Sequence, residues 1–295
     1  DTHYQPVLTY AQYDNRGNPL ESISRNGIKT SYIWGYNLTY PIAQAINSDS
    51  SSIAYSSFEE DSKGKWTYSG SVTPDATSPT GKNCYNLSGG NITKSGLTSG
   101  TYIVSYWGKS GSATVNSGSP TRTGRSFGNW TYYEHEVTGT SVTISGSIYI
   151  DEVRLYPKGA LMTTYTYSPL IGMTSQCDLN NRIIYYQYDY FNRLSLIRDQ
   201  DYNVLKKICY NYAGNPEDCG VLFYNIEKSG NFTRNNCSSG YTGSTVTYTV
   251  ADSTYSSSVS QAYADSLAQA DVNANGQAYA NSHGTCTYVC DSTSC

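Results

Sequence analysis

Short alternations of apolar and polar residues, separated by Gly, Ser, Asn and Pro, run through most of the chain and predict β-strands. The stretch STVTYTV at residues 244–250 alternates in this way. At residues 97–111, a turn precedes a strand that places Tyr102, Val104 and Tyr106 on one face and the intervening side chains on the other. We therefore expect a mainly β protein.

The strand pattern repeats with a period close to 21 residues in two separate parts of the chain. Tyr13 is followed by Trp34, and Tyr167 by Tyr188, each 21 positions later. Each unit has an aromatic strand, a turn and a second strand, and the turns read DNRGN, DLNNR and DYFNR. In the last two turns Asn stands where Gly would be easiest, because Asn tolerates the left-handed conformation that such hairpins require.

A single hairpin cannot bury its apolar face, so tandem copies are expected to stack into one sheet. The copies occupy residues 1–47 and 159–220, where the pattern resumes at LMTTYTY. We predict that residues 4–45 and 162–212 pair in one antiparallel sheet despite the gap, because completing a sheet removes exposed edges.

Residues 48–158 lack the 21-residue repeat, differ in composition, and are predicted to be an inserted domain. A Ser-rich, linker-like stretch at residues 48–57 leads into about one hundred residues of short strands punctuated by Gly, Ser and Pro. That pattern suits a β-sandwich of two sheets.

The last part of the chain, residues 221–295, begins with strands and then becomes rich in Ala. We expect a helix near residues 258–282, with Ser256 or Ser258 as its N-cap and Gly284 after its end. Cys237 and Cys286 flank this small α+β module, and a disulfide between them would stabilise a core too small to be stable by itself.

Eight cysteines favour disulfides and an oxidising compartment. Their spacing lacks the paired knuckles of a zinc site, which makes metal binding by these thiols the weaker interpretation. Clustering favours a Cys209–Cys219 pair and a Cys237–Cys286 pair, although the sequence cannot establish the pairing.

Composition narrows the function further. The 295 residues include 31 Tyr, only 14% are charged, and the net charge is −4, so the chain has no basic surplus and nucleic acid is not an expected partner. No apolar run approaches the length of a membrane span. The first residues lack a basic start followed by an apolar run, so we expect that any signal peptide is already removed or that the chain is cut from something longer.

The hairpin units YDNRGNPL and YDYFNRL resemble the YD repeats of Rhs-family proteins. The resemblance covers roughly residues 4–45 and 162–212, with Asn192 in place of the usual Gly. It implies stacked hairpins, which in that family spiral into a hollow shell, sometimes around a toxin. This chain has too few copies to enclose anything, and neither a toxin domain nor the autocleavage motif of Rhs cores is recognisable.

Residues 58–157 resemble jelly-roll carbohydrate-binding modules through an early Phe-Glu, the strand YIVSYWGK and the closing strand IDEVRLYP. The resemblance implies a structural calcium ion held partly by Glu59 and Asp151; the alternative is that Asp151 and Glu152 face solvent. It also implies glycan binding through exposed aromatic rings. The candidates are Trp66, Trp107, Trp130, Tyr132 and Tyr133. For each Trp, a place in the core is the competing interpretation.

Residues 223–286 resemble a small domain of unknown function found, often in tandem, in large surface proteins of bacteria that use type IX secretion. That resemblance implies O-linked sugar on Asp-Ser motifs, at Ser253, Ser266 or Ser292. Asn-linked sequons also occur, but a chain so rich in Ser and Thr generates them by chance.

Catalysis is not expected. Glu134 and Glu136 flank His135 and are spaced within reach of the distance that inverting glycosidases use. Neighbours two apart on a strand face the same way, however, whereas catalytic carboxylates must lie on opposite sides of the bond that is cleaved. No nucleophile, metallopeptidase or phosphate-binding motif is recognisable.

We therefore expect a non-catalytic, extracellular or cell-surface structural or adhesive protein, a stalk or filament element of a bacterial surface. Its partners would be neighbouring modules or copies of itself, and it would need no cofactor apart from the calcium ion. One alternative is a glycan-binding module that acts through the jelly-roll insert. Another is a fragment of an Rhs-type toxin-delivery shell.

Overall fold

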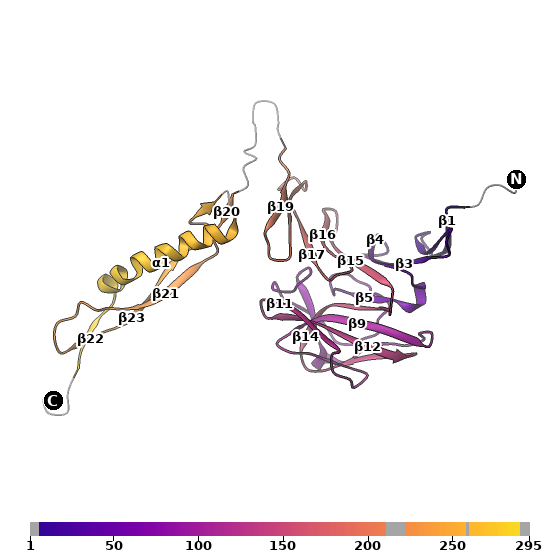
Figure 1. Ribbon diagram of the computed structural model, residues 1–295, viewed down its shortest axis with the longest axis horizontal. Helices are drawn as coiled ribbons and strands as arrows, with labels where there is room; N and C mark the ends of the chain where they lie inside the picture. The colour runs from indigo at the N-terminus through magenta and orange to yellow at the C-terminus, as the bar shows by residue number, and fades with distance from the viewer. Residues whose placement is uncertain (1–5, 211–221, 258–259, 290–295) are drawn as a thin grey trace. The chain divides into compact units, whose positions relative to one another are not determined.

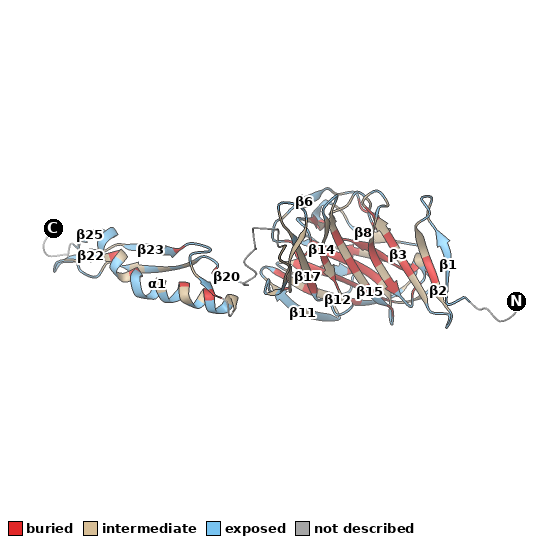
Figure 2. Ribbon diagram, turned by 90° about the horizontal axis from the view of Figure 1, so that it is seen from above, coloured by how far each residue is buried: buried red, intermediate tan, exposed pale blue. Residues whose placement is uncertain are grey.

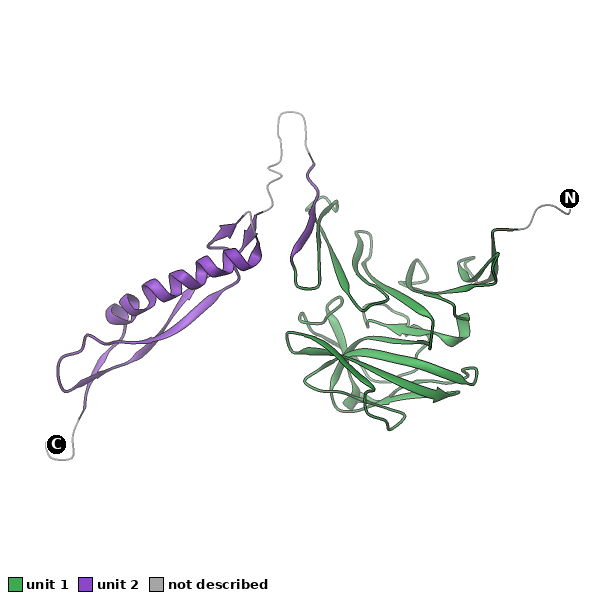
Figure 3. Cartoon of the chain, viewed as in Figure 1, with its two compact units in different colours: residues 1–202 green, residues 203–295 purple. Residues whose placement is uncertain are grey.

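The computed structural model describes residues 6–210, 222–257 and 260–289. The chain forms two compact units, residues 1–202 (unit 1) and residues 203–295 (unit 2), shown in different colours in Figure 3. Unit 1 contains a β-sandwich and strands β1–β18 of a long antiparallel sheet, whose last strand, β19, belongs to the residues counted in unit 2. Unit 2 also contains a helix packed on short strands (Figure 1).

The long sheet has nine strands, and their spatial order follows their order along the chain. The strands are β1 (Leu8–Tyr13), β2 (Pro19–Ser24), β3 (Lys29–Gly35), β4 (Tyr40–Ile46), β15 (Leu161–Ser168), β16 (Gly172–Cys177), β17 (Ile183–Tyr188), β18 (Leu194–Arg198) and β19 (Val204–Lys207). Strand β4 pairs with β15, with Ile46 opposite Leu161 and Ala43 opposite Thr164. The predicted pairing of the two separated segments in one sheet is confirmed.

Each repeated turn is held by its aspartate. The Oδ1 atom of Asp14 accepts hydrogen bonds from the backbone N–H groups two and four residues later, and Asp178 and Asp189 accept the same pair. Asn181 and Asn192 adopt φ of 61°, the left-handed conformation expected from the sequence. The repeated Asp therefore closes the hairpin, and the Asn takes the position that is strained for most other residues.

The insert, residues 48–158, forms two sheets around one core. The larger sheet has the order β11-β12-β9-β14-β7-β6, with β5 also paired to β14, and the smaller has the order β10-β13-β8. The strands of the larger sheet are β11 (Arg122–Phe127), β12 (Trp130–Gly139), β9 (Gly100–Lys109), β14 (Tyr149–Pro157), β7 (Asn83–Asn86), β6 (Val72–Pro74) and β5 (Ala54–Ser56). Those of the smaller sheet are β10 (Thr114–Val115), β13 (Val142–Ser145) and β8 (Ile92–Lys94). Ile92 and Ile144 from the smaller sheet pack with Val104, Tyr106 and Ile150 from the larger, which gives the expected two-sheet sandwich.

The Ser-rich stretch at residues 48–57 is not a linker, contrary to the sequence-based expectation. Ile53, Ala54 and Tyr55 are completely buried, and β5 pairs with β14. Ile53 and Tyr55 pack against Ile33 and Met162 of the long sheet, while Ala54 joins the core of the sandwich. A short apolar run within a polar stretch thus joins the long sheet to the sandwich. The buried residues of both are red in Figure 2.

Unit 2 is built on the helix α1 (Gln261–His283). Its strands are β20 (Phe223–Tyr224), β21 (Lys228–Thr233), β22 (Tyr241–Gly243), β23 (Thr245–Val250), β24 (Ser256–Ser257) and β25 (Cys286–Tyr288). Ala268 and Val272 of the helix pack on Val250 and Phe232 of the β21–β23 hairpin. A side chain at Gly276 would collide with the Phe232 ring, at 2.0 Å, so that position needs glycine.

The ends of helix α1 differ slightly from the prediction. Ser260 is the N-cap, and its hydroxyl accepts the N–H of Tyr263. Of the two predicted caps, Ser256 lies in β24 and Ser258 falls outside the described residues. Gly284 directly follows the helix, as predicted, and its N–H donates to the carbonyl of Ala280.

Candidate functional site

A buried ionic network joins the sandwich to the long sheet. Arg154 on β14 is 1% exposed, and its Nη2 donates to Oε1 of Glu152 at 2.9 Å. Its Nη1 donates to the carbonyl of Asp178 and to Oδ1 of Asn181, at 3.2 and 3.0 Å. One guanidinium group thus binds both its own strand and the turn between β16 and β17.

An irregularity in β14 places Glu152 within this network. The register of β14 against β9 shifts between Asp151 and Arg154, and Glu152 has φ of 55°. Its Oε2 accepts hydrogen bonds from the hydroxyls of Tyr55 and Thr80. Burial, followed by the nearby Glu152 carboxylate, raises the pKa of Tyr55. A left-handed residue in a strand is strained. At Glu152 the strain is offset by the hydrogen bonds that both of its carboxylate oxygens accept.

The two residues proposed for calcium bind the same loop. Oδ2 of Asp151 accepts the N–H of Thr80 at 2.9 Å, and Oε1 of Glu59 accepts the N–H of Lys82 at 2.7 Å and that of Asn83. Asp151 is fully buried, so it does not face solvent. In the described part of the chain no three His, Cys, Asp or Glu side chains form a metal-binding group. The geometry gives both carboxylates a role in holding this loop, and calcium stays a prediction.

Four of the five aromatic residues proposed to stack on glycan are buried. Trp107, Trp130 and Tyr132 are 0%, 1% and 4% exposed and pack with Cys84 and Cys177 in one cluster. Trp66 is buried in the sandwich core, and the half-buried Tyr133 packs against that core. The four buried rings are not exposed as a sugar platform requires, and a glycan-binding role for Tyr133 stays a prediction.

The acidic pair on β12 has structural contacts. Glu134 accepts a hydrogen bond from the Tyr132 hydroxyl, and Glu136 pairs with Lys158 at 2.8 Å. His135 points to the other face, where it is buried against Tyr106. Burial lowers the pKa of His135 to about 4.

An acidic pocket lies where the β3–β4 turn meets the start of the sandwich. It has a volume of about 400 Å³ and is lined by Tyr36, Tyr40, Glu59, Glu60 and Asp61, among others. Burial raises the pKa of Glu60 to about 7, and the adjacent Asp61 charge adds to the shift. Ser62 donates its N–H to Oε2 of Glu60, whereas Oε1 is buried without a partner.

We expect Glu60 to make the protein less stable as the pH rises. The pKa is about 7 when folded and near 4.5 when unfolded, so the folded state holds the proton more tightly between these values. Stability from this group is full below about pH 4.5 and is lost as the pH rises to about 7. Glu60→Gln should remove this loss and unfold at higher urea concentration than the wild type at pH 8. The assignment would be contradicted if the wild type and the variant had the same urea midpoint at pH 8 as well as at pH 5.

A larger cleft, of about 810 Å³, lies between the loop at residues 76–82 and strands β15–β18 of the sheet. Tyr185, Tyr188 and Tyr202 line it, together with Ser, Thr and Gln side chains. No pattern in the sequence indicates this cleft. The repeat in the sequence includes the tyrosines. It does not indicate which face of the sheet the insert covers.

Strand β1 forms one edge of the long sheet. All six of its residues are exposed, and it pairs only with β2 among the described strands. Leu8, Tyr10 and Tyr13 are each about half exposed. The edge is therefore apolar as well as open.

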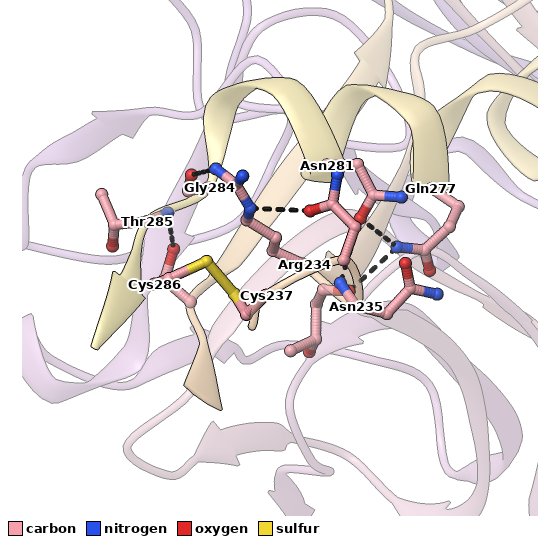
Figure 4. Close-up of a disulfide and its surroundings, with 11 residues drawn as sticks. Arg234, Asn235, Cys237, Gln277, Asn281, Gly284, Thr285 and Cys286 are labelled. Atoms are coloured by element: carbon pink, nitrogen blue, oxygen red, sulfur yellow. Dashed lines mark hydrogen bonds between the residues drawn. A yellow bond between two sulfur atoms is a disulfide. The ribbon is translucent and has the colours of Figure 1, made fainter. Parts of the chain in front are cut away.

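The disulfide of unit 2 joins the start of β25 to the loop after β21 (Figure 4). Cys237 and Cys286 are 49 positions apart in the sequence, and their Cα atoms are 5.8 Å apart. Arg234 donates to the carbonyl of Gly284 beside the disulfide, which fixes the chain after the helix. The predicted Cys237–Cys286 pair is confirmed.

Most of unit 2 matches a known protein family. Residues 223–287 match a family of unknown function (DUF5977). The DUF5977 match covers almost the same residues as the small domain recognised in the sequence, and it assigns no activity. A search of curated proteins finds no match to the chain.

The remaining predicted positions are not brought together into a site. Cys84 and Cys177 are buried thiols, and burial raises the pKa of Cys84 to about 11. The predicted Cys209–Cys219 pair cannot be placed because Cys219 lies outside the described residues. Ser253 and Ser266 are exposed, as O-glycosylation requires, and Ser292 also lies outside the described part. No helix among the described residues has the length and apolar character to cross a membrane.

Proposed function

We propose that the chain is a non-catalytic structural or adhesive segment of an extracellular bacterial surface protein built from many modules. The observation that carries the proposal is the open sheet, whose exposed, apolar edge strand β1 can accept another strand. The partner is a neighbouring module of the same polypeptide or a second copy of the chain. Resemblances to YD repeats, to jelly-roll modules and to type IX-secreted surface proteins support this setting.

Two other observations support a load-bearing role. The sandwich is fixed to the sheet by the Arg154 network and by the apolar contacts of Tyr55, which suits a rigid rod better than a flexible string of domains. The Cys237–Cys286 disulfide is typical of proteins outside the cytoplasm. A fragment of an Rhs-type toxin shell is less well supported, since the nine described strands form an open sheet.

Charge on the edge strand should block association. We expect the wild-type chain to associate as its concentration rises, and Leu8→Lys to shift the association to higher concentration by about tenfold, because a lysine on an edge opposes strand pairing. Sedimentation velocity measures this. Leu170→Lys is the control, since Leu170 is 94% exposed in the β15–β16 turn and away from the edge. Identical association of the wild type and both variants, or a wild type that stays monomeric throughout, would argue against pairing of two copies through β1.

A further inference from the structure

The cleft over strands β15–β18 has prearranged aromatic rings. The Tyr185 hydroxyl donates to the carbonyl of Pro79 in the insert at 2.8 Å, and the Tyr188 hydroxyl donates to the carbonyl of Met173 at 2.9 Å. Tyr202 stacks on Tyr185, with ring centroids 4.9 Å apart and planes 9° apart. These contacts fix the rings before any ligand arrives, which lowers the entropic cost of binding.

The rest of the lining is polar and nearly neutral. Hydroxyl and amide groups come from Ser78, Thr174, Gln187 and Ser195, among others. Ser78 is 5% exposed, and its hydroxyl has no hydrogen-bond partner stronger than the weak Cys84 thiol. A buried hydroxyl without a good partner is unusual.

The charged lining residues are Glu59 and Lys82, and they do not favour an anionic ligand. Glu59 is engaged by backbone N–H groups of the loop, which leaves Lys82 as a single cation. An extended peptide is also disfavoured, because β15 to β18 are paired with neighbours on both sides and offer no free edge.

We propose that this cleft binds a neutral oligosaccharide. A sugar ring has C–H faces that pack on tyrosine rings and hydroxyl edges that bond with Ser, Thr and Gln side chains. The volume of about 810 Å³ lies within the roughly 300–1,000 Å³ of typical ligand pockets. The site goes beyond the proposed structural role and does not depend on it, since assembly uses β1 and binding uses β15–β18.

The test is isothermal titration calorimetry of the full 295-residue chain with cello-, xylo-, manno-, malto- and chito-tetraose. Tyr202→Asn should weaken the affinity for the tetraose that binds by about tenfold, because it removes an exposed stacking ring. Asn is chosen because Tyr202 has φ of 60°, which Asn tolerates. The control is Tyr190→Asn, because Tyr190 is 96% exposed and does not line the cleft. It should leave the affinity unchanged.

Two further variants keep the proposal open to refutation. Gln187→Ala should weaken binding severalfold even if Tyr202→Asn folds poorly, because Gln187 is exposed in the cleft. Lys82→Glu should change the affinity for the same tetraose little, and a large loss would show that binding depends on the cation and overturn the proposal. So would the absence of binding to every tetraose, or binding that survives both Tyr202→Asn and Gln187→Ala.

Discussion

Replacing Arg154 by methionine should lower the free energy of unfolding of unit 1 by roughly 3–5 kcal/mol, because the change leaves the Glu152 carboxylate buried without its cation. The turn at Asp178 and Asn181 would lose its two hydrogen bonds to Nη1 at the same time. Urea unfolding followed by tryptophan fluorescence measures the effect. All four tryptophans lie within residues 1–202, so this signal reports unit 1 alone.

The matched control is Arg122→Met. Arg122 is 65% exposed and lies 3.7 Å from Glu134, so its loss should change the stability by less than about 1 kcal/mol. The double variant Glu152→Gln/Arg154→Met should recover part of the loss, since it removes both charges. If Arg154→Met were as mild as Arg122→Met, the network would not be what fixes the insert to the sheet.

Removing the disulfide with Cys237→Ser/Cys286→Ser should destabilise unit 2 by about 4 kcal/mol, from the loop entropy of a 49-residue separation. A module with so small a core has little stability to spare. We expect partial or complete loss of helix α1 at 37 °C, measured by circular dichroism at 222 nm. Tryptophan fluorescence of unit 1 should not change.

A reductant provides the control for the double variant that lacks the disulfide. Adding dithiothreitol to the wild type should reproduce the loss of helix signal, and adding it to the double variant should have no further effect on that signal. A helix that melts at the same temperature with and without the disulfide would show that unit 2 is stable on its packing alone.

Much of the fold was predictable because its signals are local. The Asp that closes each hairpin and the left-handed Asn are encoded within five residues, so the turns of the long sheet could be read directly. The interruption was predictable because the repeat stops and resumes. Cys237 and Cys286 flank a helix in a module too small for a large core, and that arrangement suggested their pairing.

The predictions that were wrong concern burial, which depends on which elements pack against each strand. Tyr106 and Trp107 point to opposite faces of β9, as neighbours on a strand do, yet both are fully buried because β9 is covered on both faces. Residues 48–57 look like a linker because Ser dominates, yet three apolar residues suffice to make them a buried strand. The charges of Asp151 and Glu152 allowed the interpretation that both face solvent, whereas both are buried and Glu152 is paired with Arg154.

The order of strands in the long sheet determines how it would respond to tension. A pull applied to β1 and β18 acts across the strands, so it loads the hydrogen bonds of one strand pair at a time and peels the hairpins in sequence. Each peeled hairpin releases length while the rest of the sheet stays folded. Between β4 and β15 the chain passes through the insert, so separation of this pair transfers the load to the sandwich. The insert therefore divides the sheet into two sets of hairpins, with the sandwich carrying the load between them.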